Sequence, residues 1–68
     1  MKFGLVIMMK IIKIIGINNC TLVVYQTCED YYYQFAIIDE EGIILEPGDI
    51  FATSEDAEEE GREIINCF

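Results

Sequence analysis

The 68-residue chain contains no histidine and only one serine, Ser54. Histidine is the usual base for serine and cysteine nucleophiles and the commonest metal ligand besides cysteine. Ser54 precedes a run of acids, where a helix cap belongs. No glycine-rich phosphate-binding loop occurs, and paired carboxylates catalyse glycoside hydrolysis only in a cleft that separates their pKa values. The sequence therefore predicts a protein that is not an enzyme and uses no cofactor.

Cysteine is scarce, and its spacing lacks a CxxC motif: the chain has Cys20, Cys28 and Cys67. A disulfide framework in a short secreted chain needs an even number, so we expect reduced thiols in the cytoplasm. A zinc site made of the three thiols and one carboxylate is the alternative. If residues 20–28 are extended, Cys20 and Cys28 lie about 26 Å apart, at ~3.3 Å per residue. Two thiols so far apart cannot share one ion, and we predict no metal site.

Basic residues are also few, with four Lys and Arg against 13 Asp and Glu, for a net charge of −9. Residues 1–28 contain three lysines and no acid (+3), whereas residues 29–68 hold every acid and one base, Arg62 (−12). Such segregation leaves a field of one sign over part of the surface, which repels nucleic acid and anionic lipid and attracts basic proteins. We therefore expect a basic protein partner, and neither direct nucleic-acid binding nor membrane binding.

The apolar start of the chain does not fit a signal peptide or a membrane span. Lys10 and Lys13 interrupt the run MKFGLVIMMKIIKIIG, and no small-residue cleavage site follows. The run is also too short and too charged to cross a bilayer. Translation could begin at Met8 or Met9. We therefore expect a single domain over residues 1–68, with residues 1–8 as a disordered lead.

The first half of the chain is rich in Ile and Val, which favour strands. We predict strands over roughly 9–15 and 20–28, joined as a hairpin that breaks at Gly16–Asn19. A helix over residues 3–15, with Lys10 and Lys13 on one face, is the alternative.

Three further extended segments follow a Glu29–Asp30 turn. The aromatic run YYYQFAII predicts a third strand over 31–38. The DEEG turn leads to a short fourth strand over 42–45, because its glycine supplies positive φ. A Pro-Gly turn at 46–49 then allows an extended edge over 49–52.

The last segment predicts a helix that begins after a cap at Thr53 or Ser54, with acids in the first turn. Its apolar residues recur at helical spacing and form one stripe: Ala57, Gly61, Ile64, Ile65 and Phe68. Gly61 would let the helix approach the sheet closely. The opposite side carries Glu55, Asp56, Glu59, Arg62 and Glu63. The predicted class is α+β: a small antiparallel sheet of three to four strands, with one C-terminal helix packed on one face.

One helix covers only one face of a sheet. Strand 31–38 is nevertheless apolar on both sides, because Tyr32, Ala36 and Ile38 alternate with Tyr33, Phe35 and Ile37. We therefore expect a homodimer or a bound partner over the second face.

The acidic helix has two interpretations. It can be a solvated face that keeps an apolar protein soluble, although carboxylates at i,i+4 repel and only Arg62 relieves them. Alternatively, its carboxylates imitate phosphates, about 5–6 Å apart at Cβ, and bind a basic nucleic-acid-binding protein or nuclease complex. The candidate partner-binding residues are Glu55, Asp56, Glu59 and Glu63 on the helix, Asp39, Glu40 and Glu41 in a loop, and Tyr32 as an outward aromatic anchor.

In size, acidity and lack of catalytic groups the chain resembles, as a class, the small inhibitors of phages and mobile elements, such as anti-CRISPR and anti-restriction proteins. That resemblance implies a nucleic-acid mimic that blocks nucleic-acid loading. Residues 31–65, YYYQFAIIDEEG…IFATSEDAEEEGREII, also resemble the strand–strand–helix run of HicB-type antitoxin domains. This second resemblance implies neutralisation of an RNA-cleaving toxin. A structural or oligomeric module with a merely solubilising acidic face is the third interpretation.

Overall fold

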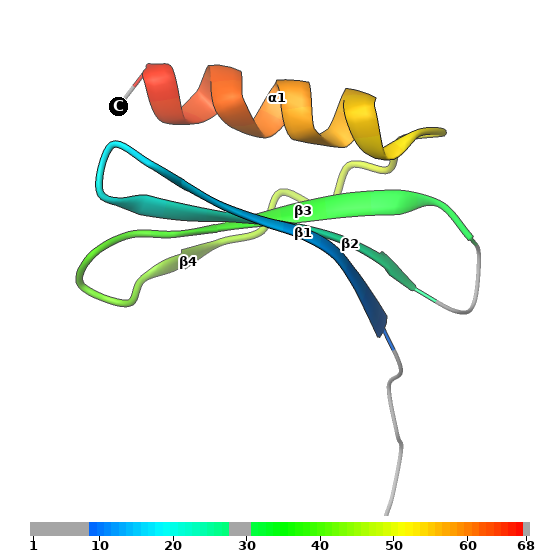
Figure 1. The fold of residues 1–68 in the computed structure, drawn as a ribbon, viewed down its shortest axis with the longest axis horizontal. Coiled ribbons are helices and arrows are strands. Elements are labelled where there is room, and N and C mark those ends of the chain that lie inside the picture. Colours follow the sequence, from blue (N-terminus) through cyan, green and yellow to red (C-terminus); the bar gives the residue numbers. More distant parts are fainter. Residues whose placement is uncertain (1–8, 28–30, 68) are drawn as a thin grey trace, which may run out of the picture.

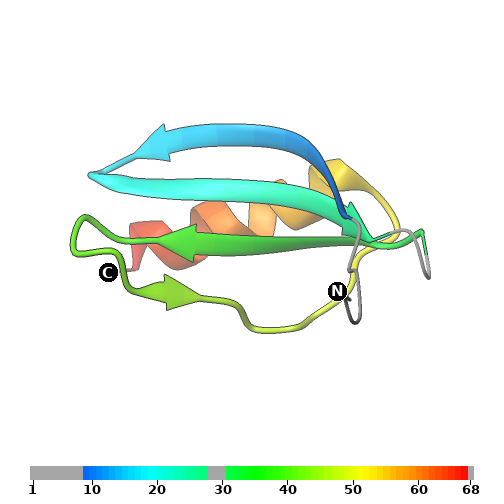
Figure 2. The same ribbon diagram turned by 90° about the horizontal axis from the view of Figure 1, so that it is seen from below.

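The computed structural model describes residues 9–27 and 31–67. Four strands form one antiparallel sheet in sequence order, namely β1 (Met9–Ile17), β2 (Cys20–Thr27), β3 (Tyr33–Ile38) and β4 (Ile44–Leu45). One helix, α1 (Ser54–Asn66), lies across one face of this sheet (Figure 1). Figure 2 looks onto the other face, with α1 behind the strands. The predicted α+β class, antiparallel sheet and C-terminal helix are confirmed.

The β1–β2 hairpin turns at Asn18 and Asn19, whose φ angles of 50° and 67° are those of a two-residue turn with positive φ at both positions. β1 therefore runs through Gly16 to Ile17, two residues further than predicted. The alternative helix is wrong for residues 9–15, and its remainder lies outside the described residues. β2 is described as far as Thr27, so the predicted end of that strand at Cys28 also lies outside them.

β3 begins at Tyr33, two residues later than predicted, because Tyr31 has a φ of 62°. A residue in the left-handed region cannot continue a strand. The Tyr31 N–H instead donates to the Thr27 carbonyl at 3.3 Å.

β4 has two residues rather than four, although Gly42 does supply positive φ in its turn, at 90°. The pairs Ile37↔Leu45 and Tyr33↔Phe51 leave five residues, 46–50, opposite the three residues 34–36. The Pro-Gly turn makes this edge bulge away from β3 (Figure 2). The extended edge predicted over 49–52 is therefore reduced to the single bridge at Phe51.

The core lies between α1 and the face of the sheet that α1 covers. Its fully buried side chains are Leu22, Val24, Phe35, Ile37, Ala57 and Ile65. The predicted apolar stripe of the helix is confirmed at Ala57, Gly61 and Ile65, which are buried, and Ile64 is half-buried. Phe68 lies outside the described residues. Among residues 9–27 and 31–67, no helix reaches the length and apolarity that crossing a bilayer requires.

Candidate functional site: the acidic face of helix α1

Helix α1 begins with a side-chain cap. Thr53 has extended backbone, and its Oγ1 accepts the Asp56 N–H at 3.1 Å. Of the two caps predicted, Thr53 is therefore the one used. Glu55 and Asp56 occupy the first turn, where carboxylates interact favourably with the positive end of the helix dipole.

Packing of the apolar stripe determines which acids face solvent. With Ala57, Gly61 and Ile65 against the sheet, four carboxylates project outward and are exposed; we call Glu55, Asp56, Glu59 and Glu63 the acidic face. At 1.5 Å of rise per residue, the first and last of them lie about 12 Å apart along the axis. The outward orientation predicted for these four residues is confirmed.

Glu58 is placed differently, at the flank of α1. Lys13 Nζ lies 3.3 Å from Glu58 Oε1, and Arg62 Nε lies 2.8 Å from Glu58 Oε2. The hydrogen bond from Arg62, followed by that from Lys13, holds the pKa of the Glu58 carboxyl below its ordinary value of 4.5. The expectation that only Arg62 relieves the helix acids is wrong, because Lys13 of β1 also contributes.

Lys13 reaches Glu58 because of a β-bulge. Ile11 pairs with Tyr25, whereas Lys13 pairs with Val24, so one extra residue lies between them. In a regular strand Ile11 and Lys13 would point to the same face. The bulge turns Lys13 to the α1 side. Lys13 and Arg62 therefore both bind Glu58, and within the described residues no ion pair involves the acidic face.

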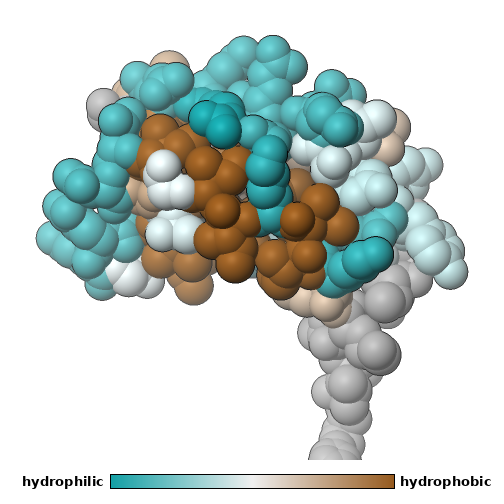
Figure 3. All heavy atoms as spheres, viewed as in Figure 1, coloured by the Kyte–Doolittle hydropathy of each residue, from teal (hydrophilic) through white to brown (hydrophobic). Residues whose placement is uncertain are grey.

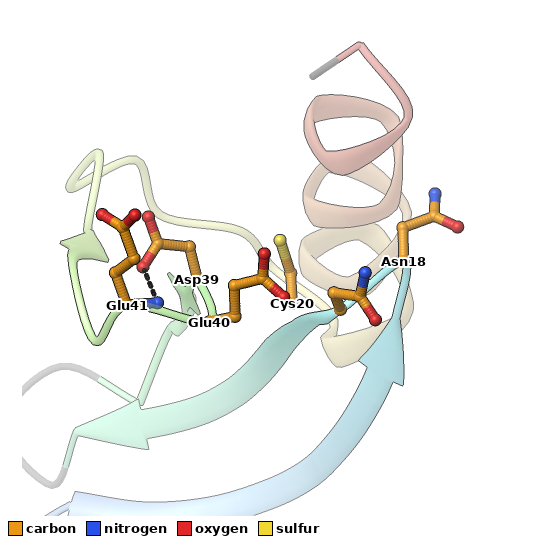
Figure 4. Close-up of a pocket in the computed structure, with 6 residues that line it drawn as sticks. Asn18, Cys20, Asp39, Glu40 and Glu41 are labelled. Atoms are coloured by element: carbon orange, nitrogen blue, oxygen red, sulfur yellow. Dashed lines mark hydrogen bonds between the residues drawn. The ribbon is translucent and has the colours of Figure 1, made fainter.

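The loop acids form a second, separate group. The Asp39 side chain accepts the N–H groups of Glu41 and Ile43 at 2.9 Å each, so it shapes the β3–β4 turn. Figure 4 shows the pocket that these acids line beside the β1–β2 turn; its residues are Asn18, Asn19, Cys20, Asp39, Glu40 and Glu41.

This loop lies at the end of the molecule where α1 ends (Figure 1). Asn18, in the neighbouring turn, donates to Asn66 of the last helical turn at 3.4 Å. The structure therefore brings the loop acids towards the Glu63 end of the acidic face, and not to Glu55 and Asp56.

Tyr32 precedes β3 at the opposite end of the sheet, where α1 begins. Its side chain is 45% exposed, whereas Phe35 and Ile37 are buried under the helix, as predicted. Tyr31, which sequence reasoning did not single out, is more exposed still. Tyr31 also has a left-handed backbone, for which a Tyr-Tyr-Tyr run contains no signal.

The structure describes two of the three cysteines, Cys20 and Cys67. Cys20 is half-buried and Cys67 is exposed, and both are free thiols. Cys28 lies outside the described residues. Within the described part of the chain, no three residues of the Cys, His, Asp and Glu types gather in a way that could hold a metal ion.

Comparison with protein-family models, with curated proteins and with solved structures finds no match for this chain. The resemblances to anti-CRISPR proteins and to HicB-type domains therefore stay predictions.

Proposed function

We propose that the chain is a small acidic inhibitor that binds, without catalysis, a basic protein that handles nucleic acid. The acidic face takes the place of a phosphate backbone in that protein's binding groove and blocks nucleic-acid loading. One observation supports this proposal most: the nearby cations Lys13 and Arg62 both bind Glu58, and among residues 9–27 and 31–67 no cation forms an ion pair with the acidic face.

The energetics of α1 support a role for these acids beyond hydration. Glu55, Glu59 and Glu63 succeed one another at i,i+4, where each like-charge pair costs roughly 0.2–0.5 kcal/mol. Only the first turn gains from the helix dipole. Glu63 lies near the negative end, and the last turn contains no basic residue to offset it. A face that serves only hydration needs no such unfavourable arrangement, whereas a face that binds cations does.

The geometry also suits a groove that binds phosphates. Residues four apart on a helix rise about 6 Å along its axis, so the acidic face is a short rigid ladder of anions. A protein that binds a nucleic-acid backbone presents Lys and Arg to such a ladder and releases counterions on contact. Opposite potentials also speed association and make it sensitive to salt. Tyr32, at the end where α1 begins, would add an aromatic anchor, since tyrosine is enriched at binding hot spots.

The test is affinity capture on the immobilised chain from a lysate of its source cells, with elution by a salt gradient and by duplex DNA or RNA. We expect a basic protein that either competitor releases. The triple variant Glu55→Lys, Glu59→Lys, Glu63→Lys should lose this capture and keep the circular dichroism spectrum of the native chain.

Two single variants, Glu59→Lys on the helix and Asp49→Lys in the β4–α1 connection, form a matched pair, because each makes the same change in net charge and Asp49 is exposed and lies outside the candidate residues. Unchanged capture by the helix variant, or equal loss by both variants, would refute the assignment to the acidic face. A nuclease effector complex among the captured proteins supports the proposal. A small RNA-cleaving toxin would instead support the antitoxin interpretation. If no captured protein responds to salt, the acids only solubilise a structural module.

A further inference from the structure

The face of the sheet that α1 leaves uncovered, here called the open face, is apolar. Strand register places on it Ile11, Ile14, Val23, Tyr25, Ala36, Ile38 and Ile44, because residues paired across strands project to the same side. Ile14, on β1, is 65% exposed and Ile44, on β4, is 61% exposed, whereas Tyr25 and Ala36, on the two strands between them, are buried. Neither isoleucine belongs to the core under the helix. Figure 2 looks directly onto this face.

The open face is also uncharged. The described strand residues on it that are not apolar are Gly16, Thr21, Thr27 and Gln34. Lys13 points to the α1 side, as its ion pair with Glu58 shows. Lys10 pairs with Gln26 and lies on that same side. Glu46 lies beside this face, and its carboxylate accepts the Tyr25 hydroxyl at 2.5 Å.

We propose that a second copy of this chain covers the open face, with the two sheets packed face to face. Charge decides the occupant. Copies of a chain with a net charge of −9 repel each other through most surfaces, and the open face is an uncharged surface with the acidic face on the far side of the sheet. With the two sheets ~10 Å apart and a helix a similar distance outside each, the two acidic faces are separated by about 30 Å. That distance is nearly four Debye lengths at physiological salt, at about 8 Å each, so burial of the isoleucines proceeds against little repulsion.

Pairing through the β1 edge is the competing arrangement. Figure 3, in which the β1 edge faces the reader, shows the apolar side chains that gather on this side of the molecule. Two β1 strands side by side would bring Lys10 and Lys13 close to their symmetry mates. Both helices would then lie over one continuous sheet, about 20 Å apart at four strand spacings. Lysines and a bulge on an edge strand are devices that oppose such pairing. Charge therefore favours the open face.

The arrangement has a consequence for binding. A face-to-face dimer displays its two acidic faces on opposite sides, directed away from each other. Each protomer can then bind its own copy of a basic protein, and dimerisation and partner binding do not compete.

Light scattering and sedimentation of the full chain test this inference. We expect twice the single-chain mass, maintained at high salt, since an apolar interface is not screened. Ile14→Lys should halve the mass. The matched control is Ile43→Lys: Ile43 is 63% exposed, but as a neighbour of Ile44 in extended chain it projects to the other side of the sheet. Ile43→Lys should leave the mass doubled. Ile44→Lys, on the open face at the other edge of the sheet, should repeat the Ile14→Lys result.

Amide exchange separates the two arrangements. Some β1 amides form no hydrogen bond with β2. In a face-to-face dimer, these amides should exchange with solvent as fast as they do in the Ile14→Lys monomer. Protection of those amides indicates edge pairing and overturns the proposal, as does equal dissociation by Ile43→Lys. The proposal is also overturned if the native chain keeps the single-chain mass up to millimolar concentration. High salt distinguishes the two proposals. It should weaken capture of a basic partner by the acidic face, and it should leave the dimer intact.

Discussion

An ideal Cβ placed on Gly61 would lie 2.5 Å from Cδ1 of Leu22. Gly61 faces the sheet from the middle of α1, and Leu22 is fully buried beneath it. The absence of a side chain at Gly61 thus determines how closely α1 approaches β2.

Gly61→Ala should therefore destabilise the fold, although alanine is the better helix former by about 1 kcal/mol. Overpacking a filled core costs roughly 1–3 kcal/mol, and the fully buried Leu22 side chain would have to shift to admit the new methyl group. We expect a net loss of about 1 kcal/mol in the free energy of unfolding, measured in urea. In a Leu22→Val background the same substitution should be neutral or stabilising. Glu59→Ala, an exposed position on the same helix, is the control. A stabilising Gly61→Ala in the native background would contradict the close packing of Gly61 on Leu22.

We predict that ionisation of the Tyr25 hydroxyl lowers the stability of the fold at alkaline pH. Burial of the ring, together with the hydrogen bond to Glu46 and the charge of that residue, raises the pKa of Tyr25 to about 12 from its ordinary value of 10.0. Because the folded-state pKa is the higher one, this contribution to stability is complete below pH 10 and is lost as pH rises towards 12. Thermal unfolding over that range should show a decline that is smaller in Tyr25→Phe.

Ultraviolet titration of the tyrosines tests the same group directly. The absorbance step with the highest midpoint should vanish in Tyr25→Phe and shift part of the way down in Glu46→Gln. The shift is only partial because burial of the ring, the largest cause, remains in that variant. A titration curve that Tyr25→Phe leaves unchanged at its upper end would argue against the buried hydroxyl.

We predict that protonation of Glu58 lowers the stability of the fold at acid pH. Its pKa is lowered in the folded state, so its contribution to stability is present above the unfolded-state pKa and is lost as pH falls through the folded-state pKa. In an NMR titration of the side-chain carboxyls, we expect Glu58 to have a midpoint below 4.5. The midpoint should rise more in Arg62→Met than in Lys13→Met, because the Arg62 hydrogen bond is the larger cause. Equal midpoints in all three proteins would mean that neither ion pair forms in solution.

Like-charge repulsion on the acidic face predicts that a charge reversal there is tolerated. In Glu59→Lys, the i,i+4 interactions of residue 59 with Glu55 and Glu63 change from repulsive to attractive. We expect a gain of roughly 0.2–0.5 kcal/mol in unfolding free energy for each pair. The gain should shrink in high salt. A matched reversal at Glu40, in the loop, should show no such gain. Loss of stability in Glu59→Lys at low salt would indicate that these side chains are not aligned as the helix predicts.

Local patterns made much of the fold predictable. The helix follows from a cap residue, acids in the first turn and apolar residues three and four apart, all within 16 residues of chain. The turns at 39–42 and 46–49 are marked by glycine and proline, whose backbone preferences are intrinsic. The β3 start was missed by two residues because a left-handed tyrosine has no sequence signal. The two-residue length of β4 was missed because its partner register depends on the rest of the sheet.

The candidate site was predictable only in part. Helical spacing alone shows that Glu55, Asp56, Glu59 and Glu63 share the side away from the apolar stripe. The partners of Glu58 were not predictable, because Lys13 lies 45 positions away in the sequence. The separation of the loop acids from the start of α1 was also not predictable, since it depends on which end of the sheet each connection occupies.

The sequence by itself determined an acidic helix on a small antiparallel sheet, because periodicity, capping and turn chemistry act between near neighbours in the chain. Only the tertiary structure decided which charges are neutralised and which face stays apolar. The bulge between Ile11 and Lys13 turns Lys13 towards Glu58 and Ile14 towards the open face. A single extra residue in a strand reverses the alternation of every side chain after it. That reversal depends on pairing with β2 and is not present in the order of the residues.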